Sequence, residues 1–272
     1  MRERVIGIDF SGSSNAGGKI WIAEGMLQNG AVEITSCRPA SCLATDGAKL
    51  EGALKALREH VAPQSGSIVG LDFPFGLPAC VVRETDWRAF VDDFRTSYGS
   101  PDEFRAAMRQ LTGGKEPKRA TDKEASTPFG CWNLKLYRQT YWGIADVLAS
   151  LLEQDAVRVL PMQTPNDGKP WLIEICPAST LRKRLKLGIS YKEPRVAGDA
   201  AHNARRTILQ RLVHDGLLLA MAGDVEKIAV ETKDGDALDS IIAAVAAAQA
   251  LRDPNLARPR SRLEAIEGRV FY

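Results

Sequence analysis

Short apolar runs separated by turn residues make up the N-terminal part of the chain. The runs cover residues 4–10, 19–26 and 31–37, and Ser, Gly and Asn predominate between them. β-branched and apolar runs of this length, bounded by turn residues, are typical of strands. Gln28-Asn29-Gly30 is a typical hairpin sequence between the second and third runs. We therefore predict that the chain opens with three antiparallel strands in meander order.

A helical spacing of apolar residues over residues 49–61 follows, and then a short apolar run at 67–72. A helix between two strands acts as a crossover, so the fourth strand is expected to run parallel to the first. Further patterns predict helices at 87–94, 100–113, 132–152, from 179 onward and at 236–251, and strands at 157–160, 171–176 and 269–272.

These elements predict an α/β fold built on a mixed five-stranded sheet, with three antiparallel strands and then parallel strands, flanked by helices. We expect a single domain over residues 1–272, with residues 79–155 as a large helical insertion within it. The alanines of the 236–251 helix are expected to let that helix pack closely on the sheet.

Composition narrows the class of protein. The chain has 272 residues, of which 44% are hydrophobic, enough for a core that needs neither metal nor disulfide to fold. Its apolar runs are too short for a membrane-spanning helix, and we expect no signal peptide because neither an apolar segment nor a cleavage site follows the first residues. The five cysteines are an odd number without CxxC spacing, which indicates reduced thiols and a cytoplasmic location. The three histidines lack the spacing of a zinc site.

Charge indicates only local contacts with nucleic acid. The chain has 36 basic and 34 acidic residues, so any such contact must depend on patches. Residues 182–211 form one patch, interpreted as either a phosphate-binding face or a solvated helix face. Its basic residues are Arg182, Lys183, Arg184, Lys186, Lys192, Arg195, Arg205, Arg206 and Arg211. The polar loop 115–127 and the start of the next helix would recognise an unpaired nucleotide, or are an exposed, mobile insertion.

Acidic residues stand at the ends of several predicted elements. Asp9 and Asp72 each end an apolar strand, and these two strands are expected to be adjacent and parallel. Ligands of α/β sheets gather at the carboxyl ends of such strands. Two carboxylates placed there side by side repel each other and attract a cation. Oxygen ligands without His or Cys favour Mg²⁺ or Mn²⁺.

Three further acids are less distinctive. Glu174 lies near the end of a predicted strand and could instead pair with a nearby arginine. Asp236 and Asp239 open the last long helix and share one face of it because they are three residues apart. Asp236 could also be a plain helix cap.

Four motifs together resemble the domain-of-unknown-function family 429. They are Ile-Gly-Ile-Asp-Phe-Ser-Gly, Gly-Leu-Asp-Phe-Pro-Phe-Gly-Leu-Pro, Glu-Ile-Cys-Pro-Ala-Ser and Asp-Ala-Leu-Asp-Ser-Ile-Ile-Ala-Ala, in that order along nearly the whole chain. Members are regarded as predicted nucleases with an RNase H-like fold, near the RuvC resolvases. The resemblance implies that Asp9, Asp72, Glu174 and Asp239 are active-site acids, with Asp236 as a neighbour. RuvC-like enzymes commonly have glutamate on the fourth strand, where this chain has Asp72.

The resemblance implies two-metal hydrolysis of phosphodiester bonds, with Mg²⁺ or Mn²⁺ held by Asp9, Asp72, Asp236 and Asp239. The expected partner is structured or single-stranded DNA or RNA, with no membrane; a homo-oligomer is compatible with the sequence. Two alternatives stay open: a nucleotide hydrolase or phosphotransferase on the same fold, and a non-catalytic protein stabilised by metal. The candidate substrate-binding residues are Ser11, Arg119, Asn133, Tyr137, Arg182 and Lys183.

Overall fold

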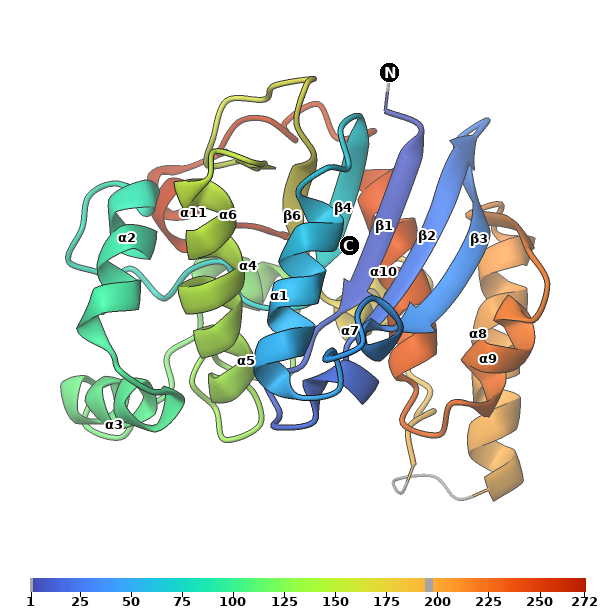
Figure 1. Cartoon of the computed structure of the whole chain (residues 1–272), viewed down its shortest axis with the longest axis horizontal. Helices are drawn as coiled ribbons and strands as arrows, with labels where there is room; N and C mark the ends of the chain where they lie inside the picture. Colours follow the sequence, from blue (N-terminus) through green and yellow to red (C-terminus); the bar gives the residue numbers. More distant parts are fainter. Residues whose placement is uncertain (1, 194–197) are drawn as a thin grey trace.

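The centre of the molecule is one mixed sheet of eight strands (Figure 1). The structure is a computed structural model that describes residues 2–193 and 198–272. Seven strands lie in the order β5-β6-β4-β1-β2-β3-β7, and β8 pairs with β6. The β1–β2 and β2–β3 pairs are antiparallel and the other pairs are parallel. The strands are β1 (Arg4–Asp9), β2 (Trp21–Gln28), β3 (Ala31–Pro39), β4 (Ser67–Leu71), β5 (Arg158–Val159), β6 (Trp171–Ile175), β7 (Leu218–Met221) and β8 (Val270–Phe271).

The predicted class and the opening meander are confirmed, and the order around β1 is consistent with RNase H-like topology. The predicted number of five strands is wrong. The chain adds the edge strand β7, which the sequence pattern had placed among helices, and the two-residue strands β5 and β8 join the same sheet. The sequence pattern does not predict β7, because the strand is only Leu-Leu-Ala-Met and an apolar run of this length without alternation does not distinguish a strand from a helix.

Helices cover both faces of the sheet (Figure 1). On one face lie α1 and the continuous helical segment α5–η3–α6, and on the other lie α7, α8, α9 and α10. The helices are α1 (Leu50–Val61), α2 (Trp87–Ser97), α3 (Pro101–Leu111), α4 (Ala120–Ala125), α5 (Tyr137–Trp142), the π-helical η3 (Gly143–Leu148), α6 (Ala149–Glu153), α7 (Pro177–Lys183), α8 (Gly198–His214), α9 (Val225–Glu231), α10 (Asp236–Ala250) and α11 (Arg262–Glu267), with short 3₁₀ turns η1 (Ala16–Gly18) and η2 (Ala40–Cys42).

Close packing of α10 on the central strands supports the role expected for its alanines. A Cβ added at Gly7 would lie 2.1 Å from the backbone nitrogen of Ala244 and 2.1 Å from the carbonyl oxygen of Ser240. Only glycine on the strand, facing small residues on the helix, allows this approach. The contact fixes the N-terminal turn of α10 beside the carboxyl ends of β1 and β4.

The segment between β4 and β5 holds α2 to α6 and no strand, as the sequence pattern predicts for residues 79–155. Two details differ. The predicted helix 132–152 begins at Tyr137, because residues 131–136 form a turn in which the Asn133 side chain accepts the Lys135 N–H. The loop 115–127 is not an exposed insertion: it contains α4, and Arg119, Thr121 and Asp122 are buried.

The five cysteines are unpaired, in agreement with the expectation of reduced thiols. Within the described residues, no helix combines the length and the apolar character that crossing a bilayer requires.

Candidate functional site

Side-chain alternation along the central strands decides which acids can meet. On β1, Ile6 and Ile8 belong to the core under α1, whereas Val5 belongs to the core under α10. Because strand residues alternate between faces, Asp9 lies on the α10 face, and the same reasoning places Asp72 there after β4. On β6, Ile173 and Ile175 face α10 but Leu172 faces the other way. Glu174 therefore projects toward the helical insertion.

The acids line a cavity of about 590 Å³ at the carboxyl ends of β1, β4 and β6. We call it the acid cavity. Its polar side holds Asp9, Asp72, Asp236, Asp239 and Lys192. The lining also includes apolar side chains, which are Phe73, Pro74, Phe129, Leu136, Ile175, Leu181, Leu187 and Ile189. Acids that are far apart in the sequence thus share one concave surface.

The four aspartates lie close enough to perturb one another. Asp9 and Asp239 are 7% and 3% exposed. Burial raises the pKa of Asp9 well above its usual range, and the charges of Asp239, Asp236 and Asp72 raise it further while Lys192 opposes them. Burial, followed by repulsion from Asp239, raises the pKa of Asp72 to about 8. The pKa of Asp236 is also raised, mainly by burial. Burial and mutual repulsion therefore make it costly to ionise all of these carboxyls at once.

Tyr191 and Lys192 complete this side of the cavity. The Tyr191 hydroxyl donates to Oδ1 of Asp239 at 2.5 Å, and the Lys192 ammonium lies 2.5 Å from Oδ2 of the same carboxylate. The ammonium is also 3.6 Å from Oδ1 of Asp236. The Lys192 ammonium thus lies beside the carboxylates of Asp239 and Asp236, in a position where a metal cation would otherwise bind them.

The donor set fits a hard divalent cation, but the described side chains are not arranged around a metal position. Buried carboxylate oxygens without cationic partners suit Mg²⁺ or Mn²⁺. Across residues 2–193 and 198–272, no three His, Cys, Asp or Glu side chains are grouped closely enough to hold an ion jointly. A metal bound here by three or more of these carboxylates would therefore require them to shift from their positions in the structure.

Glu174 has a different environment. Both of its carboxylate oxygens accept hydrogen bonds from Arg119, which donates from Nη1 to Oε2 at 2.8 Å and from Nη2 to Oε1. The backbone N–H of Phe75 also donates to Oε2, at 2.9 Å. Glu174 lines the acid cavity, but its charge is neutralised by an arginine, which is the alternative considered for it from the sequence. Its hydrogen bond to Phe75 fixes the turn that follows Asp72.

The candidate substrate-binding residues fall into two groups. Ser11 and Arg182 line the acid cavity, and Arg119 reaches it from within the protein. Arg119 is 1% exposed, and Asp122, Glu174 and the Glu267 carbonyl accept from all of its N–H groups, so no donor remains for a ligand.

Asn133, Tyr137 and Lys183 lie outside the residues that line the acid cavity. Asn133 donates to Glu116 at 2.8 Å, and the Tyr137 hydroxyl donates to Asp102 at 2.9 Å. The geometry thus gives these two polar side chains partners within the insertion rather than in the cavity.

The basic segment 182–211 does not form one continuous face. Arg205 is 2% exposed and donates to the carbonyls of Val230, Tyr191 and Lys233. Lys192 points into the acid cavity, and Arg195 lies outside the described residues. The basic residues that are close in the sequence therefore have different roles in the structure. Arg205 is a buried hydrogen-bond donor, Lys192 lines the acid cavity, and others lie at the surface.

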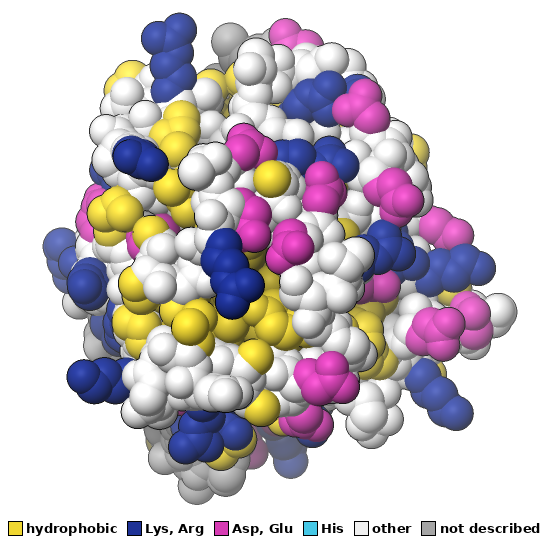
Figure 2. Space-filling view, turned by 90° about the vertical axis from the view of Figure 1, so that its left-hand side faces the viewer, with side chains coloured by type: hydrophobic (Ala, Val, Ile, Leu, Met, Phe, Trp, Pro, Cys, Tyr) yellow, Lys and Arg dark blue, Asp and Glu magenta, His cyan; other side chains and the backbone are white. Residues whose placement is uncertain are grey.

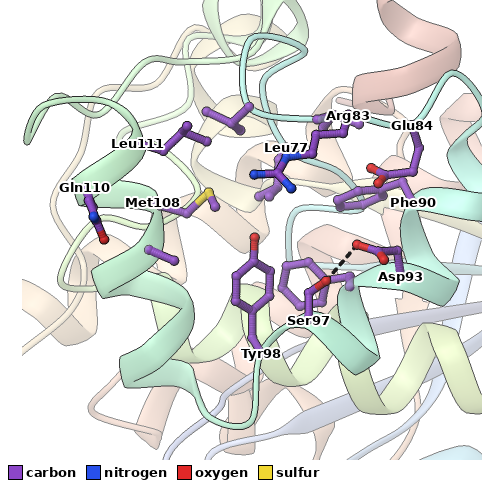
Figure 3. Close-up of a pocket in the computed structure, with 14 residues that line it drawn as sticks. Leu77, Arg83, Glu84, Phe90, Asp93, Ser97, Tyr98, Met108, Gln110 and Leu111 are labelled. Atoms are coloured by element: carbon purple, nitrogen blue, oxygen red, sulfur yellow. Dashed lines mark hydrogen bonds between the residues drawn. The ribbon is translucent and has the colours of Figure 1, made fainter.

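A second cavity, of about 650 Å³, lies between α2, α3 and the preceding loop. Arg83 extends over it toward Tyr98, above Phe90 and Met108 (Figure 3). Hydrophobic side chains gather in a band across this side of the molecule (Figure 2). The lining of this second cavity includes only two acids, and one of them, Asp93, accepts a hydrogen bond from the Ser97 hydroxyl at 2.7 Å. It lacks a carboxylate cluster, so we place the candidate chemistry in the acid cavity.

Sequence reasoning missed the roles of Tyr191, Lys192 and Gln139. Gln139 donates from its side chain to the backbone carbonyl of Asp72. Lys192 was counted only within the basic segment, and no periodic pattern around residue 191 indicates that this loop returns to the sheet. The alternation on β6, in contrast, could have separated Glu174 from the aspartates.

Comparison with known proteins gives a family without a function. A family model described as a protein of unknown function (DUF429) matches residues 7–262. No curated protein matches the chain. No solved structure matches it either.

Proposed function

Since the chain belongs to the DUF429 family, whose description states no function, we propose from the acid cavity itself that this protein is a metal-dependent nuclease. The observation that carries the proposal is the convergence of Asp9, Asp72, Asp236 and Asp239 from three elements into one cavity, where Lys192 is the one ammonium in the described residues that forms ion pairs with them. Buried carboxylates in excess of nearby cations are costly unless a cation joins them. We assign the fold as RNase H-like on the strand order around β1.

The residues of the acid cavity would have different roles in the reaction. Asp9 and Asp72 would hold Mg²⁺ or Mn²⁺, with Asp236 and Asp239 adjacent, and the bound metal would lower the pKa of a water and polarise a phosphate oxygen. In the overall reaction the water oxygen bonds to phosphorus, one P–O ester bond breaks, and the leaving oxygen takes up a proton. Lys192 reduces the negative charge that an approaching phosphate meets. Glu174, held by Arg119, is a positioning residue that keeps the turn after Asp72 in place.

The cavity favours an unpaired strand as substrate. Its volume of about 590 Å³ lies in the range of small-ligand pockets, so it admits a nucleotide unit rather than a duplex. The apolar side chains of Phe129 and Ile189 offer a surface for a base, and Ser11 and Arg182 can contact phosphate or sugar. A nucleic-acid strand, DNA or RNA, is therefore the proposed partner; the cavity is formed within one chain, so the proposal requires no homo-oligomer.

The test is cleavage of labelled single-stranded, duplex and branched DNA and RNA by the full chain with Mg²⁺, Mn²⁺ or chelator. We expect metal-dependent cleavage of single-stranded substrate that Asp72→Asn abolishes. Asp234→Asn is the matched control, because Asp234 is a half-exposed acid that does not itself line the acid cavity. Metal-dependent ATP turnover without cleavage would favour the nucleotide hydrolase alternative. Stabilisation by metal with no turnover of any phosphate ester would favour the non-catalytic alternative.

A further inference from the structure

The four aspartates of the acid cavity differ in the cation they face. Asp236 and Asp239, on α10, are both paired with the Lys192 ammonium. Asp9 and Asp72, at the ends of β1 and β4, make no ion pair within the described part of the chain. The helix acids therefore contact the ammonium directly, whereas its charge acts on Asp9 and Asp72 without an ion pair.

Hydrogen bonds to the backbone on both sides of Lys192 hold this residue in position. Behind it, the buried Arg205 of α8 donates from Nη1 to the carbonyl of Tyr191 at 2.8 Å and from Nε to the carbonyl of Val230 at 2.6 Å. The N–H of Glu193 donates to the carbonyl of Lys233 at 3.1 Å. The residues on both sides of Lys192 are thus tied to α8 and to the chain just before α10.

This inference rests on the proposed function. We propose that the Lys192 ammonium takes the place of one of the two metal ions, so that the site binds a single divalent cation at Asp9 and Asp72. A site for two metal ions needs carboxylates without cationic partners on both the strands and α10. Here the carboxylates on α10 are already paired with an ammonium that the fold holds in position.

The ammonium also has a donor left for substrate. Lys192 carries three N–H groups, and even one donor to each of Asp239 and Asp236 leaves a third. Its side chain is 37% exposed, so that donor is accessible from the cavity. Lys192 can therefore meet a non-bridging oxygen of the phosphodiester on the side of the site away from the metal.

The experiment counts the ions bound by the full chain, using calorimetric titration with Mn²⁺ and no substrate. The wild-type protein is expected to bind one ion per chain in the acid cavity. Lys192→Met, which removes the ammonium and keeps a side chain of similar length, is expected to bind two. Lys19→Met is the matched control: Lys19 also lines the cavity but pairs with Asp234, and the variant is expected to bind one ion.

Two ions in the wild-type protein would overturn the inference and leave the proposed function standing. A folded Lys192→Met variant that binds one ion with wild-type affinity would also overturn it. No ion bound by the wild-type protein would overturn the proposed function itself. If Lys192→Met does not fold, the wild-type count and Lys192→Arg, which keeps the charge and is expected to bind one ion, decide the question.

Discussion

The two groups of acids in the same cavity have opposite charge environments. Glu174 and Asp122 surround Arg119 in a buried network that balances negative with positive charge and satisfies the guanidinium completely. Asp9 is buried and Asp72 is partly buried in the same cavity, but among the described residues neither has an arginine of its own, and the charges of neighbouring carboxylates raise the pKa of both. A buried acid with its own arginine stabilises the structure, whereas acids without one keep their protons to a higher pH, and a bound cation would favour their ionised form.

The Arg119 network predicts the largest loss of stability. Arg119→Met leaves Glu174 and Asp122 buried without a counter-charge, and breaking such a pair costs about 3–5 kcal/mol. Urea unfolding measures this cost. Arg182→Met is the control, because Arg182 is exposed at the same cavity and the substitution is expected to cost less than about 0.5 kcal/mol. Equal effects of the two variants would contradict the structural role of the network.

The aspartate group predicts a loss of activity without a loss of stability. Asp72→Asn is expected to lower the metal-dependent cleavage rate by about a hundred-fold or more, because metal-bound charge is worth several kcal/mol in the transition state. In chelator the same variant is expected to be at least as stable as the wild-type protein, since it removes a carboxylate that repels its neighbours. A variant that loses both properties together would place Asp72 with the structural acids instead.

The effect of Mg²⁺ on stability distinguishes the aspartates of the acid cavity from acids elsewhere. Saturating Mg²⁺ is expected to raise the free energy of unfolding of the wild-type protein, by about 2.7 kcal/mol at a hundred times the dissociation constant. Asp9→Asn and Asp72→Asn are expected to lose this gain, whereas Asp234→Asn keeps it. Thermal unfolding with Mg²⁺ and with chelator measures the difference. A full gain in Asp72→Asn would show that the ion binds elsewhere.

The pH dependence of stability in chelator tests the raised pKa of Asp72 itself. The pKa of Asp72 rises from 3.8 to about 8 in the folded protein, so the folded state keeps a proton that the unfolded chain releases. The free energy of unfolding therefore falls as the pH rises from about 4 to about 8 and is flat above that range for this group. Urea unfolding across that range should show a shallower fall in Asp72→Asn. An identical slope in both proteins would contradict the raised pKa.

Local patterns were enough to predict the fold around the site. The opening meander, the crossover helix and the close packing of α10 follow from periodicity, turn residues and alanine content. They also bring Asp9, Asp72, Asp236 and Asp239 to one sheet edge, as expected from parallel strands that share their carboxyl ends.

What the sequence did not predict depends on contacts between distant segments. Arg119 was expected to meet substrate, but it pairs with Glu174 across the fold, a contact that no spacing encodes. Lys192 reaches the aspartates because Arg205 anchors its loop. β7 is too short for its pattern to be distinguished from a helix. The acids could be located from local rules, whereas their charge partners could not.

The most direct test of the aspartate cluster as a cation site is a crystal structure of the full chain with Mn²⁺, recorded at a wavelength that gives anomalous signal from the metal. Our account predicts an anomalous peak coordinated by Asp9 and Asp72, with the Lys192 ammonium still beside Asp236 and Asp239. A structure without a peak at these carboxylates, in which Asp9 and Asp72 instead pair with basic side chains, would contradict it.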